Sequence, residues 1–190
     1  MQLTNESLHT MHSFKIDVYN MALLPSGELL LSTMESNLKT ISCSTSKVEP
    51  TKYSVNPLIT LAVQYLHFYV IDNQDEKFNG RTVALDKSNG VRWIYSGHLD
   101  VNKQQTFKLD DLVATKSDNI LVTDLKHHMF HILNISGHCI LYLNTKDQLG
   151  IEFPYSLDID NTGTLYIGCY KYLGEPDEAK IYTVQVSGFY

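Results

Sequence analysis

The chain has 190 residues, of which 43% are hydrophobic and 19% are charged, a composition typical of a globular protein with a substantial core. Fifteen Lys and Arg residues against 21 Asp and Glu residues give a net charge of −6, which disfavours an extensive phosphate-binding surface. No apolar run approaches the roughly 20 residues that span a bilayer, so we expect no membrane segment.

The N-terminal residues and the cysteines bear on the location of the protein. Residues 1–13 lack the basic and apolar regions of a secretory signal. Cys43, Cys139 and Cys169 lie far apart, without the C-x-x-C spacing of a zinc site, and their odd number argues against a disulfide framework. We therefore expect free thiols and a reducing compartment, the cytoplasm.

After an N-terminal extension over residues 1–16, the chain consists of short apolar or alternating runs separated by turn residues, with almost no helical periodicity. The residues Asn161 and Gly163, for example, predict a tight turn between two alternating runs. The runs predict strands at residues 20–23, 29–32, 38–41, 58–63, 67–72, 82–85, 91–95, 111–115, 120–124, 128–133, 138–143, 155–159, 165–169 and 180–186.

These strands repeat as a unit. The second strand of each unit ends at Ser32, Asp72, Asp124 and Gly168, so the steps are 40, 52 and 44 residues (72 − 32, 124 − 72 and 168 − 124). Antiparallel units of four strands at this period are typical of a β-propeller, in which each sheet buries its faces against its neighbours around an axis. The prediction is an all-β propeller, with blades at residues 17–48, 55–96, 107–144 and 153–187.

Residues 120–133, ILVTDLKHHMFHIL, resemble an NHL repeat, in which a strand ends in Asp and a short loop leads to a His that opens the next strand; Asp124 and His128 match. Residues 80–85, 90–98 and 150–160 are similar to the last blades of NHL propellers in tripartite-motif (TRIM) ubiquitin ligases. The resemblance implies an incomplete six-bladed ring and a non-catalytic domain that recognises proteins. The RING and B-box zinc fingers that ubiquitin transfer requires have no counterpart in this sequence, so we expect no enzymatic activity.

The loops that interrupt the repeat supply the candidate partner-binding residues. These are Asp75, Lys77, Asn79, His98, Asn102, Lys126 and His127. The resemblance implies a protein partner for them, such as a substrate for ubiquitination. We expect no cofactor and no bound metal.

Two alternative functions remain open. One is RNA binding through a basic rim, which the resemblance also allows because some NHL propellers bind RNA, and the other is the metal-dependent hydrolase or lyase chemistry that some six-bladed propellers carry out at the central channel. As strand residues, His127 and His131 would share a face and His128 would point away, but we interpret all three as packing or surface residues because two imidazoles alone make a poor metal site. Asp72 and Asp124 end equivalent strands, and we interpret both as fixing the loops that follow.

Three further patterns have structural interpretations. Asp110 and Asp111 are interpreted as a solvated loop pair before a strand, rather than as acid-base groups. Residues 158–163 resemble the start of a calcium loop, but the twelfth position is Cys169, so we predict a turn. Trp93 and Tyr95 alternate onto one strand face, where we expect them to pack one blade against the next.

Overall fold

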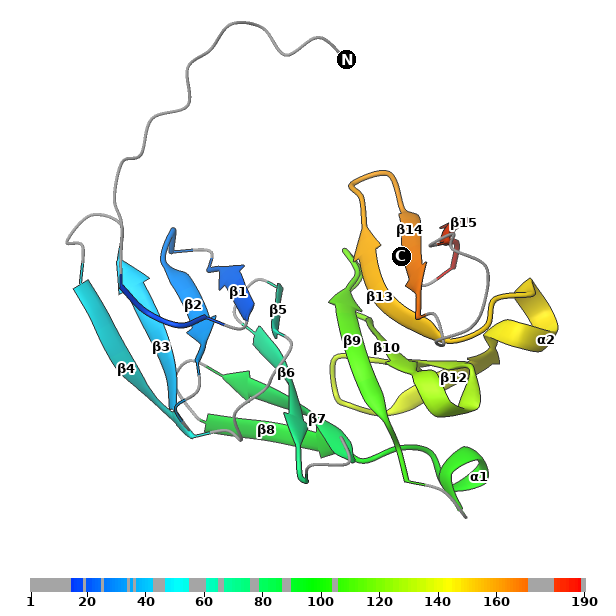
Figure 1. The fold of residues 1–190 in the computed structure, drawn as a ribbon, viewed down its shortest axis with the longest axis horizontal. Helices are drawn as coiled ribbons and strands as arrows, with labels where there is room; N and C mark the ends of the chain where they lie inside the picture. The colour runs from blue at the N-terminus through cyan, green and yellow to red at the C-terminus, as the bar shows by residue number, and fades with distance from the viewer. Residues whose placement is uncertain are drawn as a thin grey trace, which may run out of the picture.

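The fold was analysed in a computed structural model of the chain (Figure 1). The structure describes residues 15–18, 20–24, 26–33, 35, 37–42, 47–54, 61–64, 67–75, 79–86, 90–103, 106–170 and 180–188.

The described residues form four antiparallel sheets in chain order. The first three sheets each have four strands, hydrogen-bonded in sequence order. They are β1 (Asn20–Leu23), β2 (Leu29–Ser32), β3 (Asn37–Ser42) and β4 (Lys47–Ser54); β5 (Leu61–Gln64), β6 (His67–Asn73), β7 (Gly80–Asp86) and β8 (Gly90–Tyr95); and β9 (Leu109–Ala114), β10 (Ile120–Asp124), β11 (Met129–Leu133) and β12 (Cys139–Asn144).

The fourth sheet has three strands within the described residues, β13 (Pro154–Ile159), β14 (Thr164–Cys169) and β15 (Ile181–Gln185). Three short helical segments lie in the connections, α1 (Leu99–Asn102), the 3-10 helix η1 (Leu125–His127) and α2 (Thr145–Leu149). No helix among the described residues has both the length and the hydropathy to cross a bilayer.

The sheets are arranged as the blades of a propeller. The first strand of each sheet lies beside the first strand of the next, β1 beside β5, β5 beside β9 and β9 beside β13 (Figure 1). The first strands are therefore innermost and the later strands lie further out, as the repeat predicts. The all-β fold with propeller blades is confirmed, and the four sheets form part of a ring.

The blades bury their faces in two apolar clusters. One joins the first three sheets and includes Leu30, Tyr69 and Ile120, and the other joins the third and fourth sheets and includes Leu121 and Ile167. Ile120 and Leu121 are neighbours in β10 whose side chains point to opposite faces, and both are buried. A strand buried on both faces reads as a continuous apolar run, which explains why β10 shows less alternation than the fourth sheet.

Long connections gather on one rim of the propeller. Because successive strands are antiparallel, the second and fourth strands of every sheet end at the same rim. The loop after β6, the connection with α1 after β8, the segment η1 after β10 and the helix α2 after β12 therefore share this rim, which we call the loop rim. The opposite rim carries tight turns, such as that at Gly163, whose φ of 86° is the positive value that a tight turn requires.

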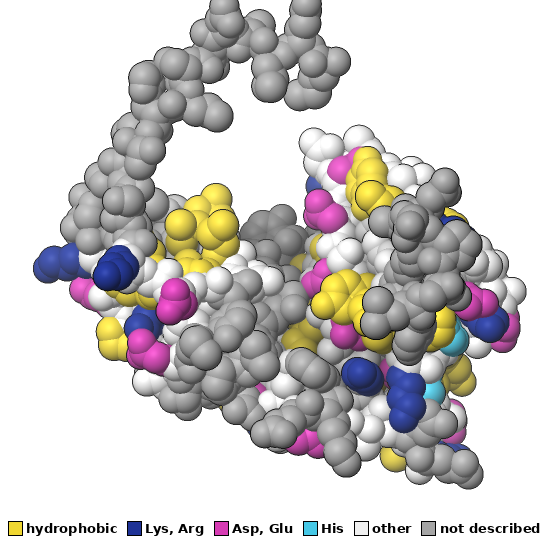
Figure 2. Space-filling model, in the orientation of Figure 1, with side chains coloured by type: hydrophobic (Ala, Val, Ile, Leu, Met, Phe, Trp, Pro, Cys, Tyr) yellow, Lys and Arg dark blue, Asp and Glu magenta, His cyan; other side chains and the backbone are white. Residues whose placement is uncertain are grey.

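The two end sheets of the arc expose different chemistry. An apolar patch lies over β1 and β2 (Figure 2), and Met21 and Leu23 are 64% and 65% exposed there. On the outer face of the fourth sheet, Asp158, Tyr166 and Thr183 are paired across the strands and exposed. The same face of the fourth sheet carries Ile181, which is 73% exposed, so apolar side chains are exposed on both ends of the open arc.

Candidate functional site

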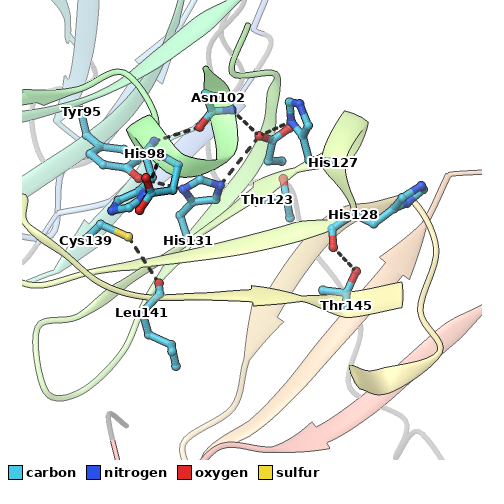
Figure 3. A network of polar contacts seen from close by, with 12 residues as sticks. Tyr95, His98, Asn102, Thr123, His127, His128, His131, Cys139, Leu141 and Thr145 are labelled. Carbon is cyan, nitrogen blue, oxygen red and sulfur yellow. Dashed lines mark hydrogen bonds and ion pairs between the residues drawn. The ribbon is translucent and has the colours of Figure 1, made fainter. Parts of the chain in front are cut away.

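A buried carboxylate, Asp124, lies at the loop rim next to Asn102, His127 and His131, which Figure 3 labels. Its side chain is 0% exposed at the end of β10. Its Oδ2 atom accepts a hydrogen bond from Asn102 Nδ2 at 3.0 Å and lies 2.7 Å from His127 Nδ1. His131 Nε2 is 3.8 Å from the same oxygen. One carboxylate therefore links the connection before the third blade to η1, and it lies close to a histidine of β11.

The connection before the third blade is built to place Asn102. The Oδ1 atom of Asn102 accepts the backbone N–H of His98 at 2.9 Å. The His98 ring accepts the N–H of Asp100, and this bond caps the N-terminus of α1. Gly97 has a φ of +99°, and a Cβ there would lie 2.6 Å from Asn102 Oδ1. Glycine is therefore required at this position, both for its backbone conformation and for the close approach of Asn102.

One of the three histidines lies differently from the prediction. His127 is in η1, outside the strands, whereas His128 follows in the left-handed conformation with a φ of 51° and β11 begins at Met129, so the placement of His128 at the start of a strand is wrong. His128 turns toward the fourth blade, where its Nδ1 accepts the N–H of Phe153 at 3.0 Å. The one-turn helix η1 causes this difference between the predicted and the observed position of the strand, and the apolar pattern of the sequence does not reveal it.

His131 in β11 is fully buried against aromatic rings. Its Nδ1 lies 2.7 Å from the Tyr95 hydroxyl, which comes from the last strand of the second blade, and its ring lies 4.9 Å from that of Phe107. Tyr95 and Phe107 pack edge to face at 5.4 Å. The sequence analysis did not predict this hydrogen bond between blades. A His and a Tyr inside apolar strands indicate such a bond, because buried polar groups need partners.

Burial dominates the ionisation of this cluster. It lowers the pKa of His131 to about 4, helped by repulsion from His98 and His127, so the ring is neutral at pH 7. It also raises the pKa of Tyr95 and that of Asp124, the latter against the opposing charge and hydrogen bonds of His127 and Asn102. A Tyr95 hydroxyl that donates to Nδ1 leaves the His131 proton on Nε2, facing Asp124.

The buried cluster retains unused hydrogen-bonding capacity. Asp124 Oδ1, His127 Nε2 and His131 Nε2 are buried without a hydrogen-bond partner among the described residues. Within the same residues, no group of three or more His, Cys, Asp or Glu side chains has an arrangement that could hold a metal ion. The bonds that Asp124 does make link the loops beside it, as its interpretation from the sequence proposed, through the side chains of Asn102 and His127 and the backbone of His127.

The predicted contact residues fall into two groups on the loop rim. His98, Asn102 and His127 lie around Asp124, and Lys126 is exposed beside them. Asp75 and Asn79 lie on the loop after β6, where two hydrogen bonds of 3.1 and 2.7 Å join them. Lys77 lies outside the described residues.

Lys108 connects the two groups through the backbone. Asn79 forms an isolated antiparallel bridge with Lys108, whose carbonyl accepts the N–H of Leu125 at the start of η1. The rim also presents a residue that the sequence did not single out, Leu99 in α1, which is 81% exposed. Nothing in the local pattern distinguishes Leu99 from a buried leucine, because its helix has only one turn.

Asp72, which ends β6's buried run, and Asp160, in the turn over residues 158–163, also have partners within the chain. Arg81 Nε and NH2 both lie 2.8 Å from Asp72 Oδ2, and Gln74 also donates to that oxygen. The Asp160 carboxylate accepts from the Thr162 hydroxyl and from the N–H groups of Thr164 and Thr162, in the predicted turn, and these bonds lower its pKa to about 2.

Two contacts hold adjacent blades together at the level of their strands. Trp93 donates its Nε1–H to the carbonyl of Ile135 in the third blade at 2.9 Å, which confirms the expected packing role. Asp110 and Asp111 are in β9, so their assignment to a solvated loop is wrong. Asp111 accepts the N–H of Leu157 in the fourth blade, and burial raises the pKa of both carboxyls to about 6.

A surface pocket of about 630 Å³ lies away from this rim cluster, beside the first blade. Its lining includes Lys15, Asp17, Glu35 and Lys39, and the last two form an ion pair. Mixed, exposed charges of this kind offer no desolvated reactive group. We therefore place the candidate functional site on the loop rim.

Comparison with known proteins identifies the architecture only. No protein-family model and no curated protein matches the sequence. Among solved structures, the WD40 repeats of RRP9 match with a TM-score of 0.59 and 9% identity, over 83% of this chain and 46% of that chain. The structure of U3-55K matches with a TM-score of 0.60 and 9% identity, over 83% and 47%. The chain spans just under half the length of these propellers, and the likeness shows the fold alone.

Proposed function

We propose that this chain is a non-catalytic protein-recognition module that binds its partner through the loop rim. The resemblance of residues 120–133 to an NHL repeat of TRIM ligases supports this role and makes a ubiquitination substrate the first class of partner to test. Propellers of many kinds share one scaffold and differ in their loops, so the proposal depends on the rim and not on the fold.

The observation that carries the proposal is the fixed geometry around Asp124. A carboxylate that binds Asn102 and His127 joins the connection with α1 to the segment η1. Loops that are ordered before binding lose less conformational entropy when a partner docks. Asn102 and His127 thus position the rim, while exposed residues next to them make the contacts.

Leu99 is the central contact residue in this proposal. Its side chain is 81% exposed, and the flanking His98 packs its ring 4.9 Å from that of Tyr142. Lys126 and Asp100 are exposed on the same rim. Protein-binding sites combine an apolar centre with a polar rim, and an exposed apolar side chain on a rim that also carries charged side chains fits this composition.

The distribution of basic side chains favours protein over RNA as the partner. Lys and Arg side chains are interspersed with Asp and Glu on the face shown in Figure 2. Both arginines have partners inside the chain, Arg81 with Asp72 and Arg92 with His67. Free cysteines at positions 139 and 169 fit the proposed cytoplasmic location, where thiols stay reduced.

Quantitative affinity purification with the full chain as bait tests the proposal. We expect Leu99→Asp and Lys126→Glu each to reduce the captured amount of the same set of proteins at least tenfold. Each variant should keep the thermal unfolding temperature of the wild type. Ile135→Asp, which changes a 38% exposed residue on the opposite rim, is the matched control and should retain the set.

Equal capture by Leu99→Asp, Lys126→Glu and wild type contradicts a loop-rim site. Capture that disappears after nuclease treatment, together with a steep loss of affinity for single-stranded RNA as salt is raised, contradicts the choice of a protein partner.

A further inference from the structure

The outer edge of β15 has no partner strand in the part of the chain that the structure describes. The first three blades each have a fourth strand, whereas β15 pairs with β14 alone within the described residues. The third and fourth blades are nevertheless packed together through a common apolar cluster. Among the described residues, the fourth blade thus has no strand in the position that β4, β8 and β12 occupy in the other blades.

The backbone groups along this edge can be assigned from the pairing of β15 with β14. Cys169 donates its N–H to the carbonyl of Lys180, and Val186 donates to the carbonyl of Gly163. Successive residues of an antiparallel strand point their N–H and C=O groups to opposite sides. Lys180, Tyr182, Val184 and Val186 therefore face β14, and the intervening residues Ile181, Thr183 and Gln185 direct their backbone groups outward.

This edge lacks the protection found on the outer strands of the other blades. Exposed edges are usually blocked by a charge, a proline or a bulge. The strand β4 contains Pro50 as well as charged residues, β8 contains Arg92, and the pairing of β12 with β11 has a bulge. The five residues of β15 contain no charge and no proline, and their register with β14 is continuous.

Side chains beside the edge define what an added strand needs. Leu141 in β12 pairs with Ile132, which is buried in the cluster that faces the fourth blade, yet Leu141 is 46% exposed. Paired residues share a face, so Leu141 faces the place where a fourth strand would lie. Tyr182 and Val184 of β15 are half-buried on the same side, so the cluster is left partly uncovered there.

We propose that the edge of β15 binds an extended segment of a partner protein by β-strand addition. The segment is about as long as β15, five residues, runs antiparallel to it, and has apolar side chains at alternate positions to cover Leu141 and Val184. An acidic residue at its C-terminal end would lie near the exposed Lys180, at the start of β15. This site is separate from the loop rim and does not depend on the function proposed there.

The probe is the synthetic peptide acetyl-TVTVTVE, added to the full chain with nitrogen-15 labelling. We expect amide exchange of Ile181, Thr183 and Gln185 to slow when the peptide binds, while the amides of Tyr182 and Val184, which already bond to β14, change little. The peptide acetyl-TVTPTVE, which cannot donate from its centre, should bind at least tenfold more weakly.

Thr183→Pro is the decisive variant. It removes an outward N–H without breaking a bond to β14, so the fold is retained and the affinity for the peptide falls at least tenfold. Thr183→Val, the matched control, keeps the N–H and the affinity. Unchanged thermal unfolding of both variants shows that the fourth blade is intact.

Several results overturn the proposal. One is binding by folded Thr183→Pro as tight as by wild type, and another is no binding of the peptide by wild type at millimolar concentration. Protection of the three outward amides in the free, monomeric protein means that another segment of the chain fills the edge. Protection that appears only with concentration-dependent dimerisation means that a second copy fills it. Each of these results leaves the test of the loop rim unaffected.

Discussion

The carboxylate of Asp111 in β9 accepts the backbone N–H of Leu157 in β13 at 2.7 Å. The two residues belong to the innermost strands of adjacent blades, so the bond joins the third and fourth blades near the propeller axis. A second oxygen of the same side chain accepts the N–H of Leu112. The fourth blade is therefore fixed by a polar contact as well as by its apolar cluster.

Asp111→Ala removes this contact. We expect the free energy of unfolding to fall by about 1–3 kcal/mol at pH 6, because the Leu157 N–H loses its acceptor in a half-buried position. Urea unfolding measures the loss, and faster amide exchange at Leu157 localises it. Asp158→Asn, at an exposed position of β13, is the control and should change stability by less than about 0.5 kcal/mol. A loss that is equal in both variants contradicts the role of the bond.

Gly137→Ala tests the packing of Trp93 against the third blade. A Cβ at position 137 would lie 2.5 Å from the indole ring, and the φ of +79° is also unfavourable for alanine. Gly27 has nearly the same φ, +82°, with no atom within 4 Å of its added Cβ, so Gly27→Ala measures the backbone cost alone.

We expect Gly137→Ala to be less stable than Gly27→Ala by about 1–3 kcal/mol, the usual cost of an overpacked site. Trp93 is the only tryptophan in the chain, so its fluorescence reports directly on this contact. Equal stabilities of the two variants would contradict tight packing at this site, and a shifted emission spectrum would then show that the ring had moved aside without cost.

His131→Phe tests the buried imidazole and its dependence on pH. At pH 7 the Tyr95 hydroxyl loses its partner, and we expect a cost of about 1–3 kcal/mol. The unfolded chain binds a proton at His131 below about pH 6.5, whereas the folded chain does so only near its pKa of about 4. The wild type therefore loses stability as the pH falls between these values, and the variant lacks this contribution.

The cost of His131→Phe should consequently shrink between pH 7 and pH 4.5, as measured by urea unfolding at both values. Asp110 and Asp111 act in the opposite sense, because their pKa values are raised to about 6 and they destabilise the fold as the pH rises toward 6. Both are present in wild type and variant, so their effect cancels in the difference. A cost that grows on acidification is incompatible with a neutral His131.

Asn102→Ala tests the link between α1 and the loop after β10. The buried Asp124 carboxylate loses a donor, and we expect a loss of about 1.5–3 kcal/mol together with faster amide exchange in η1. Lys103→Ala, the adjacent control, breaks only an ion pair between two exposed side chains and should have little effect. If exchange in η1 stays unchanged, Asn102 does not order that segment.

The hairpins and their repeat could be predicted because each depends on neighbours in the sequence. The turn at Gly163 and the alternating residues on either side of it specify a hairpin locally, and the recurrence of such hairpins specifies a propeller. The absence of a fourth strand next to β15 within the described residues was not predicted, since no local pattern requires a sheet to have four strands.

The organisation of the candidate site could be predicted only in part. The rim loops were located as interruptions of the repeat, but the bond between Tyr95 and His131 joins residues 36 positions apart and depends on how two blades face each other. His128 was placed at the start of a strand, whereas a single turn of 3-10 helix precedes it and β11 begins at Met129. Contacts of this range are decided by tertiary packing, which periodicity does not encode.

Because the long connections lie on one rim, the two rims differ in the sequence changes that they tolerate. A lengthened segment there adds only a small loop-closure entropy, while the turn between β11 and β12, where Gly137 lies directly against Trp93, accepts almost no added volume. Libraries of randomised loops intended to give this scaffold new binding specificities should therefore be built between β6 and β7 or between β8 and β9, and the turn at Gly137 should be left as it is.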